Sequence, residues 1–184
     1  MNIKIEKPLT KEEIQKLYTE FKTPEHVKRH CMGVSNTAAR IAEALVAYGV
    51  DLDVELIKST SIIHDAARIY DDHDLVISDK LDEMGHHIAA DITRVHMHYK
   101  GLERKPDITE TDIVCLADRL VKEDEYVGLD ERMEYIINKF GRTPEREQRI
   151  YAGKKKTQSF IDMVEEITGK SIDDIVKGYN GETR

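Results

Sequence analysis

Apolar residues recur at three- and four-residue steps along most of the chain, which is the spacing that places them on one face of an α-helix. The longest stripe lies in a segment that we expect to be helical from Pro24 to about Tyr48, with Gly49 at its end. This stripe consists of Val27, Cys31, Val34, Ala38, Ile41, Leu45 and Tyr48. Because patterns typical of strands are nearly absent, the sequence predicts an all-α fold.

Capping residues and glycines predict the remaining helices. The run Thr10–Glu13 is a capping box that opens a short helix through about Phe21. Asp53 can cap a helix that ends in the adjacent pair His64-Asp65. Further helical segments are expected over about 74–84, 86–99, 109–121, 129–140, 143–168 and 171–177.

Charge and composition limit the classes of function. The segment Met1–Lys7 has no continuous apolar core, and no later segment approaches the roughly 20 apolar residues of a membrane span, so we expect a soluble, cytoplasmic protein without a membrane partner. Cys31 and Cys115 lie in apolar helical patterns and are predicted to be reduced, buried thiols. The net charge of −8 argues against general binding to nucleic acids, but it allows a local basic pocket for a small phosphate compound.

Histidine and aspartate residues cluster in the apolar helical segments. The pair His64-Asp65 follows an apolar run, where an imidazole and a carboxylate are costly to bury without a positive partner. His30 lies within the long apolar stripe, and Asp118 is the only acid in its apolar run. A single helical histidine is usually a structural residue, so the evidence for a functional site is the clustering of several such residues. Imidazole and carboxylate groups suit iron, manganese, cobalt, nickel or zinc, and the sequence therefore predicts a divalent transition-metal site.

A polar stripe further along the chain adds two candidate ligands. His87 and His98 are eleven residues apart and so fall about 20° from one face of a continuous helix. They are candidates either to bind a second ion or to line the substrate pocket. We expect His86 and His96, on other faces of the same helix, to be exposed to solvent, and His73 to lie on the surface in its acidic turn.

The order of His30, His64-Asp65 and Asp118 along the chain resembles the H…HD…D signature of the HD superfamily of metal-dependent phosphohydrolases. The surrounding sequences also resemble those of the superfamily, in the segments Glu25–Val34, Ile62–Arg68 and Cys115–Leu120. The resemblance implies that these four side chains hold one divalent metal ion. It further implies hydrolysis of a phosphate ester or anhydride of a nucleotide or related small molecule by metal-activated water.

The resemblance covers roughly residues 20–130. It implies that the HD-domain helical bundle occupies this range and that additional C-terminal helices follow over about 131–184. We therefore expect a single domain over 1–184, a length that can bury roughly 70% of the unfolded surface. The sequence leaves the oligomeric state open, a homo-oligomer included.

Residues near the predicted ligands are candidates for catalysis. Arg68 follows His64 by one helical turn and could contact a phosphate oxygen, or it could pair with Asp71 or Asp72. Besides ligating the metal, Asp65 could accept a proton from the attacking water, a role that the resemblance suggests. The segment Val95–Gly101 resembles the region in which two-metal members, such as the diadenosine tetraphosphate hydrolases, carry extra histidines.

Two other classes of function remain open at this point. One is a non-catalytic nucleotide-binding or regulatory module in which the metal is structural, although the complete ligand set argues against a decayed site. The other is a di-iron oxygenase on the same fold, which needs two metal ions. Tight nucleotide retention without turnover would indicate the first class, and oxygen uptake would indicate the second.

Overall fold

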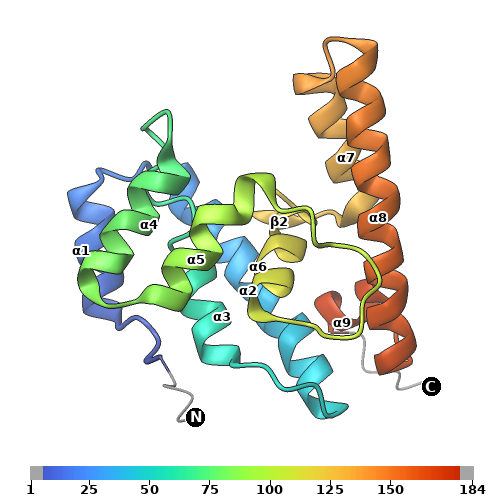
Figure 1. The fold of residues 1–184 in the computed structure, drawn as a ribbon, viewed down its shortest axis with the longest axis horizontal. Coiled ribbons are helices and arrows are strands. Elements are labelled where there is room, and N and C mark those ends of the chain that lie inside the picture. Colours follow the sequence, from blue (N-terminus) through green and yellow to red (C-terminus); the bar gives the residue numbers. More distant parts are fainter. Residues whose placement is uncertain (1–5, 179–184) are drawn as a thin grey trace.

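The computed structural model describes residues 6–178, and its helices are gathered around the long helix α2 (Figure 1). The helices are α1 (Lys11–Glu20), α2 (Glu25–Ala47), α3 (Val54–Ser61), α4 (His73–Met84), α5 (His87–Val95), α6 (Glu110–Asp118), α7 (Gly128–Phe140), α8 (Pro144–Thr168) and α9 (Ile172–Lys177). A 3-10 helix, η1 (His96–His98), and an antiparallel hairpin of β1 (Val121–Lys122) with β2 (Glu125–Tyr126) complete the described part. The predicted all-α class is confirmed.

The predicted caps explain where several helices begin. The Thr10 hydroxyl accepts a hydrogen bond from the backbone of Glu13 at 3.2 Å, and the Glu13 carboxylate accepts one from the backbone of Thr10 at 2.8 Å. Asp53 caps α3 by accepting a hydrogen bond from the backbone of Leu56 at 2.9 Å. At the other end of α4, Gly85 adopts a left-handed conformation with φ of 86°, which glycine tolerates without strain. These local signals therefore set the helix boundaries as expected.

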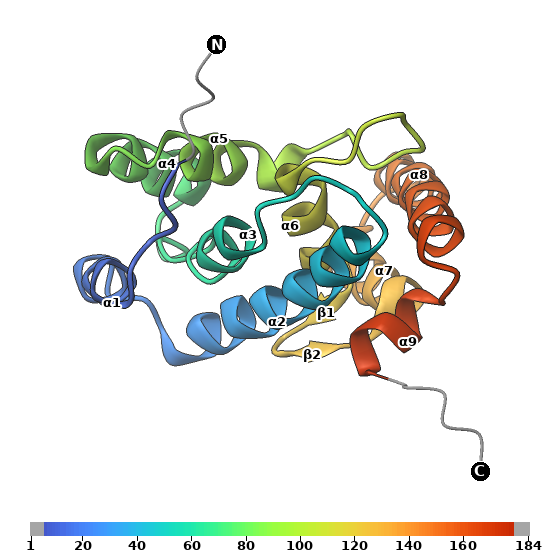
Figure 2. The same ribbon diagram turned by 90° about the horizontal axis from the view of Figure 1, so that it is seen from below.

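The main hydrophobic core surrounds α2. Helices α3, α6 and α9 and the β-hairpin all pack against it (Figure 2). Ile41 of α2 is fully buried in a cluster that also contains Phe160 of α8 and Ile175 of α9. The C-terminal helices therefore share the core of the central helix. Cys31 and Cys115 are buried free thiols, as predicted.

A second hydrophobic cluster joins α1, α4 and α5. Ile63, which precedes the pair His64-Asp65, belongs to this second cluster. Ala117, which precedes Asp118, belongs to the main cluster. The candidate ligands therefore lie where the two clusters meet, in an interior position that the folding of both clusters fixes.

Helices α7 and α8 form a hairpin whose outer part stands beyond the rest of the molecule (Figure 1). At the base of this hairpin, α7 contacts β1, and α8 contacts α2 and α9. Leu129 and Met133 of α7 are buried in the main core, whereas Phe140 at its end is half exposed. The hairpin is therefore anchored at one end, and α7 forms a wall beside the interior ligands.

The helix predicted to end in the pair His64-Asp65 is shorter than expected, because α3 ends at Ser61. Residues 62–69 instead form a run of tight turns. Several of their backbone N–H groups donate to a carbonyl three residues earlier, as Arg68 does to Asp65 at 2.9 Å. Because α-helices and 3-10 turns both bring residues i and i+3 together, the apolar pattern could not distinguish them.

No helix in the described part of the chain is both long enough and apolar enough to cross a membrane. Residues 1–5 of the N-terminal segment Met1–Lys7 lie outside the described residues. The sequence-based expectation for that segment therefore stays a prediction.

Candidate metal centre

Backbone carbonyl groups fix the orientation of two histidine rings. Nδ1 of His30 donates a hydrogen bond to the carbonyl oxygen of Glu123 at 2.5 Å, and Nδ1 of His64 donates to that of Ser61 at 2.7 Å. A neutral ring that donates from Nδ1 carries a lone pair on Nε2. The Nε2 atoms lie 3.2 and 3.9 Å from Oδ1 of Asp118. Two lone pairs thus converge on a carboxylate, which is the arrangement in which metal ligands are held by their outer hydrogen bonds.

The carbonyl group of Glu123 reaches His30 because the β-hairpin lies directly against α2. A Cβ atom at Gly33 would lie 2.5 Å from the carbonyl oxygen of Asp124, closer than any side chain allows. Glu123 itself has a φ of 55°, in the left-handed region that non-glycine residues rarely adopt. Sequence reasoning missed this hairpin, and the one available signal was a glycine in the interior of a long predicted helix.

Nε2 of His64 has no hydrogen-bond partner among residues 6–178, although it is buried. The His64 side chain is fully buried, and this burial lowers the pKa of its ring, so the ring is neutral. Oδ2 of Asp65 and Oδ1 of Asp118 each lie 3.9 Å from this nitrogen. A buried polar atom without a partner costs about 1–3 kcal/mol, and a cation between the nitrogen and the two carboxylates would remove this cost.

Two further histidines contact Asp65 from its other side. Oδ1 of Asp65 lies 3.0 Å from Nε2 of His73 and 3.3 Å from Nε2 of His96. Nδ1 of His96 donates to the carbonyl oxygen of Thr93 at 2.6 Å, so the neutral form of this ring also presents a lone pair on Nε2. Nη1 of Arg68 donates to Nε2 of His73 at 2.8 Å. These contacts place several acceptor atoms around one carboxylate oxygen, and such a group again suits a cation.

Asp65 therefore belongs to two groups of candidate ligands. The first group is His30, His64 and Asp65, and the second is Asp65, His73 and His96. Within each group, one ligand atom of every residue lies within 4.8 Å of the others. All of these residues are buried except His30, which is half-buried. The described part of the chain thus contains a His/Asp cluster that could hold a metal ion.

The electrostatics of the cluster keep both carboxylates ionised. Burial alone would raise the pKa of Asp118, but the neighbouring imidazoles of His30 and His64 lower it well below its usual range. Burial likewise opposes ionisation of Asp65, and the surrounding imidazoles, His64 first, lower its pKa well below the usual value. Two ionised carboxylates in the interior need positive charge nearby. Because the cluster brings the two carboxylates close together, a single cation could supply this charge.

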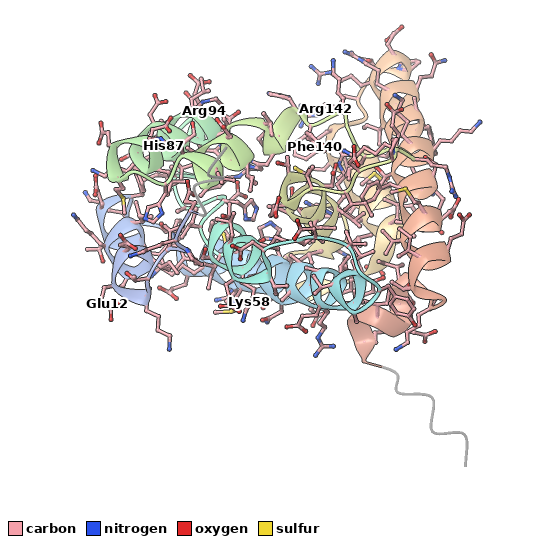
Figure 3. All side chains as sticks on the ribbon, turned by 60° about the horizontal axis from the view of Figure 1, so that its bottom comes forward. Glu12, Lys58, His87, Arg94, Phe140 and Arg142 are labelled. Atoms are coloured by element: carbon pink, nitrogen blue, oxygen red, sulfur yellow. The ribbon has the colours of Figure 1, made fainter. Side chains whose placement is uncertain are left out.

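Two of the ligands predicted from the sequence, His87 and His98, lie outside this cluster. His87 is exposed and its Nδ1 lies 2.9 Å from a carboxylate oxygen of Asp82, on the α4–α5 side of the molecule (Figure 3). His98 is exposed at the end of η1. The prediction assumed one continuous α-helix, but α5 ends at Val95, and His96–His98 form a 3-10 helix with three residues per turn. The eleven-residue spacing therefore does not bring these two rings together.

The expectation that three other histidines are exposed is wrong. His73 and His96 are each 5% exposed and His86 is 8% exposed. His73 and His96 are covered because they contact Asp65, whereas His86 lies 3.3 Å from a carboxylate oxygen of Glu13 in α1. Helical periodicity locates a residue on its own helix, but it contains no information about the polar partners that other segments supply.

A cavity of about 750 Å³ opens over the His/Asp cluster and is bounded on one side by α7. Its charged lining consists of Arg29, Arg68, Arg119, Arg132 and Lys139 together with Asp65, Asp118, Glu123 and Asp124. Five cations thus face four acids, in a chain whose net charge is −8. The cavity lining therefore has one more cation than acids, whereas the chain as a whole is acidic.

One known protein is similar to this chain over most of its length. The uncharacterized protein MJ0778 of Methanocaldococcus jannaschii is 30% identical over 142 residues, which cover 68% of this chain and 84% of the relative. No family model matches the chain, and no solved structure matches it. The name of the relative assigns it no activity.

Proposed function

This chain belongs to the same family as the Methanocaldococcus jannaschii protein, and we propose that it is a metal-dependent phosphohydrolase of the HD-superfamily type. The substrate is a phosphate ester or anhydride of a nucleotide or a related small molecule. The observation that carries this proposal is the common orientation of three imidazoles. His30, His64 and His96 each donate from Nδ1 to a backbone carbonyl group and have Nε2 near a buried carboxylate. Metal-bound histidines are held in this way in proteins.

The ligand sets follow from the two groups that share Asp65. His30, His64 and Asp65 would hold one ion, together with Asp118, which lies 3.2 Å from His30 and 3.9 Å from His64, and Asp65, His73 and His96 would hold a second. In this proposal the buried pair His73 and His96 takes the place of His87 and His98. Nitrogen and carboxylate ligands fit iron, manganese, cobalt, nickel or zinc better than magnesium or calcium.

The residues around the cluster position a phosphate group. A bound divalent ion lowers the pKa of its water from about 15.7 towards about 7 and polarises a phosphoryl oxygen. Arg68 lines the cavity with Nη1 3.8 Å from Oδ1 of Asp65, and it can donate to a phosphate oxygen that lies against the cluster. The lowered pKa of Asp65 keeps its carboxylate ionised and so able to act as a ligand. The same carboxylate remains the candidate acceptor for a proton from the attacking water, which can then pass to solvent in the open cavity.

The test is phosphate release by protein of defined metal content. Chelator-treated protein is reloaded with iron, manganese, cobalt, nickel or zinc and assayed against nucleotides and simple phosphate esters. We expect turnover that depends on the metal, and we expect His64→Ala and Asp118→Ala to lose both bound metal and turnover. His87→Ala, which alters an exposed histidine away from the cavity, is the matched control and should keep both. Absence of metal and of phosphate release across the panel would overturn the proposal.

A di-iron oxygenase is the second candidate, and the two groups of ligands that share Asp65 are the observation that favours it. Such an enzyme consumes oxygen and needs iron in both positions. Oxygen uptake by the iron-loaded protein, without phosphate release from the same compounds, would select this candidate. Phosphate release by the zinc- or manganese-loaded protein would exclude an oxygenase as the main activity, because hydrolysis needs no iron and consumes no dioxygen.

A further inference from the structure

Helix α7 forms one wall of the cavity, and its residue Arg132 lies against the proposed metal ligands. Its Nη2 lies 3.9 Å from Oδ1 of Asp118, and its side chain is only 17% exposed. Nε of Arg132 is buried and has no hydrogen-bond partner within residues 6–178. An unsatisfied donor on a buried guanidinium is costly, so this position calls for an acceptor that the described residues do not supply.

The same face of α7 continues outward to Lys139. Residues seven apart on an α-helix fall about 20° from one face, and their Cα atoms are separated by about 10.5 Å along the axis. Both cations contact the ring of Tyr135, with the Arg132 guanidinium 5.5 Å and the Lys139 ammonium 5.3 Å from its centre. Nζ of Lys139 also donates to the Tyr135 hydroxyl at 3.0 Å. All three side chains line the cavity, which gives α7 a cationic track leading away from the metal cluster.

Carboxylates do not neutralise the outer end of this track. Of the four acids that line the cavity, Asp65 and Asp118 are the proposed metal ligands, and Asp118 also lies 3.9 Å from Arg132. Asp124 pairs with Arg29 at 3.5 Å, and Glu123 forms no ion pair with the track among the described residues. No carboxylate in the described part of the chain lies within ion-pair distance of Lys139. A single phosphate group at the metal cluster would leave the outer end of the track without an anion.

Arg119, at the end of α6, adds to this excess. It donates to the Thr157 hydroxyl at 2.9 Å and to the backbone carbonyl group of Tyr99, and both of these acceptors are neutral. Burial lowers the pKa of its guanidinium, and no carboxylate among the described residues lies within ion-pair distance of it. The cavity thus has positive charge beyond what one phosphate group requires.

Building on the proposed phosphohydrolase activity, we propose that Arg132 and Lys139 form a second phosphate subsite on α7. The substrate class is then a compound with phosphate groups in series, joined by a phosphoanhydride bond, such as a nucleoside diphosphate or triphosphate. The water oxygen bonds to the phosphorus at the metal cluster while the bond from that phosphorus to the bridging oxygen breaks. The bridging oxygen leaves with the second phosphate, and the proton lost by water passes to solvent. Arg132 contacts the leaving phosphate and offsets the charge that develops on it.

The first test measures binding without turnover. Metal-loaded protein is titrated calorimetrically with methylenediphosphonate, which cannot be hydrolysed at its bridge, and with methylphosphonate, which has a single phosphonate group. We expect Arg132→Gln and Lys139→Gln to weaken binding of methylenediphosphonate by roughly tenfold or more, as for loss of a charged hydrogen bond. Binding of methylphosphonate should change by less than about twofold in Lys139→Gln, because this side chain lies far along α7.

The control is Lys155→Gln, which removes an exposed cation of α8 that lines no part of the cavity and should leave both affinities unchanged. Lys139 is exposed, so its substitution tests the subsite even if Arg132→Gln fails to fold. Equal affinity of the wild-type protein for the two probes, or equal losses for both probes in Lys139→Gln, would overturn the subsite.

The second test is turnover, and it separates the subsite from the phosphohydrolase proposal. Arg132→Gln should lower kcat/KM for nucleoside diphosphates by roughly ten- to a hundredfold while lowering that for a simple phosphomonoester much less. Equal losses on both substrates would overturn the proposed contact with the leaving phosphate. If no compound is hydrolysed but diphosphonate binding still depends on Arg132 and Lys139, the subsite stands and the phosphohydrolase proposal fails.

Discussion

Oδ1 of Asp65 lies 3.3 Å from Nε2 of His96, in a buried position, whereas His98, two residues further along, is exposed. This difference gives the first prediction. His96→Ala should remove one of the ions that share Asp65 and so lower the metal content, because its Nε2 is a proposed ligand. His98→Ala should keep the wild-type metal content. Elemental analysis of the two purified variants measures this directly, and the reverse result would restore the sequence-based pair of His87 and His98.

The second prediction concerns Gly33, which allows the β-hairpin to reach α2. A Cβ atom there would lie 2.5 Å from the carbonyl oxygen of Asp124, so Gly33→Ala should displace the hairpin and with it the carbonyl group that orients His30. We expect a loss of about 1–3 kcal/mol in the free energy of unfolding from the overpacking. We also expect metal affinity to fall by about 10- to 100-fold, since an outer partner of a ligand is lost.

Gly153 provides the matched control for this substitution. It also lies inside a long helix, α8, but a Cβ atom there meets nothing within 4 Å. Gly153→Ala should therefore stabilise the protein by about 0.5–1 kcal/mol through helix propensity and leave metal affinity unchanged. Urea unfolding and metal titration of both variants give the comparison, and equal behaviour of the two alanine variants would contradict the role assigned to Gly33.

Most of the helices, and four of the residues that meet in the His/Asp cluster, could be predicted from the sequence, for reasons that particular residues make clear. Thr10 and Gly85 act locally, so the helix ends that they define could be predicted without knowledge of the fold. His30, His64 and Asp118 stood out because polar residues in apolar runs need partners. This argument does not depend on how the helices pack.

The second group of ligands could not be predicted in the same way. The choice between His96 and His98 depends on the change from α5 to η1, which alters the angle between successive side chains and leaves little trace in the apolar pattern. His73 was assigned to the surface because its neighbours are acidic, but its ring is covered by a contact with Asp65 from another turn. Such contacts are tertiary, and the spacing of apolar residues along a single sequence does not reveal them.

The third prediction concerns the stability of the metal-free protein. Removal of metal leaves two ionised carboxylates and the unpartnered Nε2 of His64 in the interior, so chelator should lower the unfolding temperature. With free metal at about 100 times its Kd, the stabilisation is about 2.7 kcal/mol. His64→Ala should abolish the difference between metal-loaded and metal-free protein, whereas His87→Ala should preserve it. Thermal unfolding with and without metal measures the effect, and a chelator-independent unfolding temperature in the wild-type protein would contradict it.

The last prediction uses the capping box of α1 and the buried His86. The backbone hydrogen bond from Thr10, together with the contact to His86, lowers the pKa of Glu13 in the folded protein. A carboxyl group with a lowered folded pKa stabilises the protein above its unfolded pKa, and this stabilisation is lost as the pH falls through the folded value. Glu13→Gln should therefore cost roughly 0.5 kcal/mol at neutral pH, a modest value because the carboxylate is partly exposed.

The deficit of Glu13→Gln should shrink as the pH falls below about 4.5, the ordinary value for glutamate, because the carboxyl group of the unfolded wild-type protein then binds protons, whereas that of the folded protein does so only at lower pH. Urea unfolding of metal-free wild-type and variant protein across this range measures the change. His86→Ala should lower stability in the same way yet leave the metal content intact, since His86 contacts Glu13 and does not line the cavity. A deficit for Glu13→Gln that stays constant with pH would show that the side chain acts through its shape rather than through its charge.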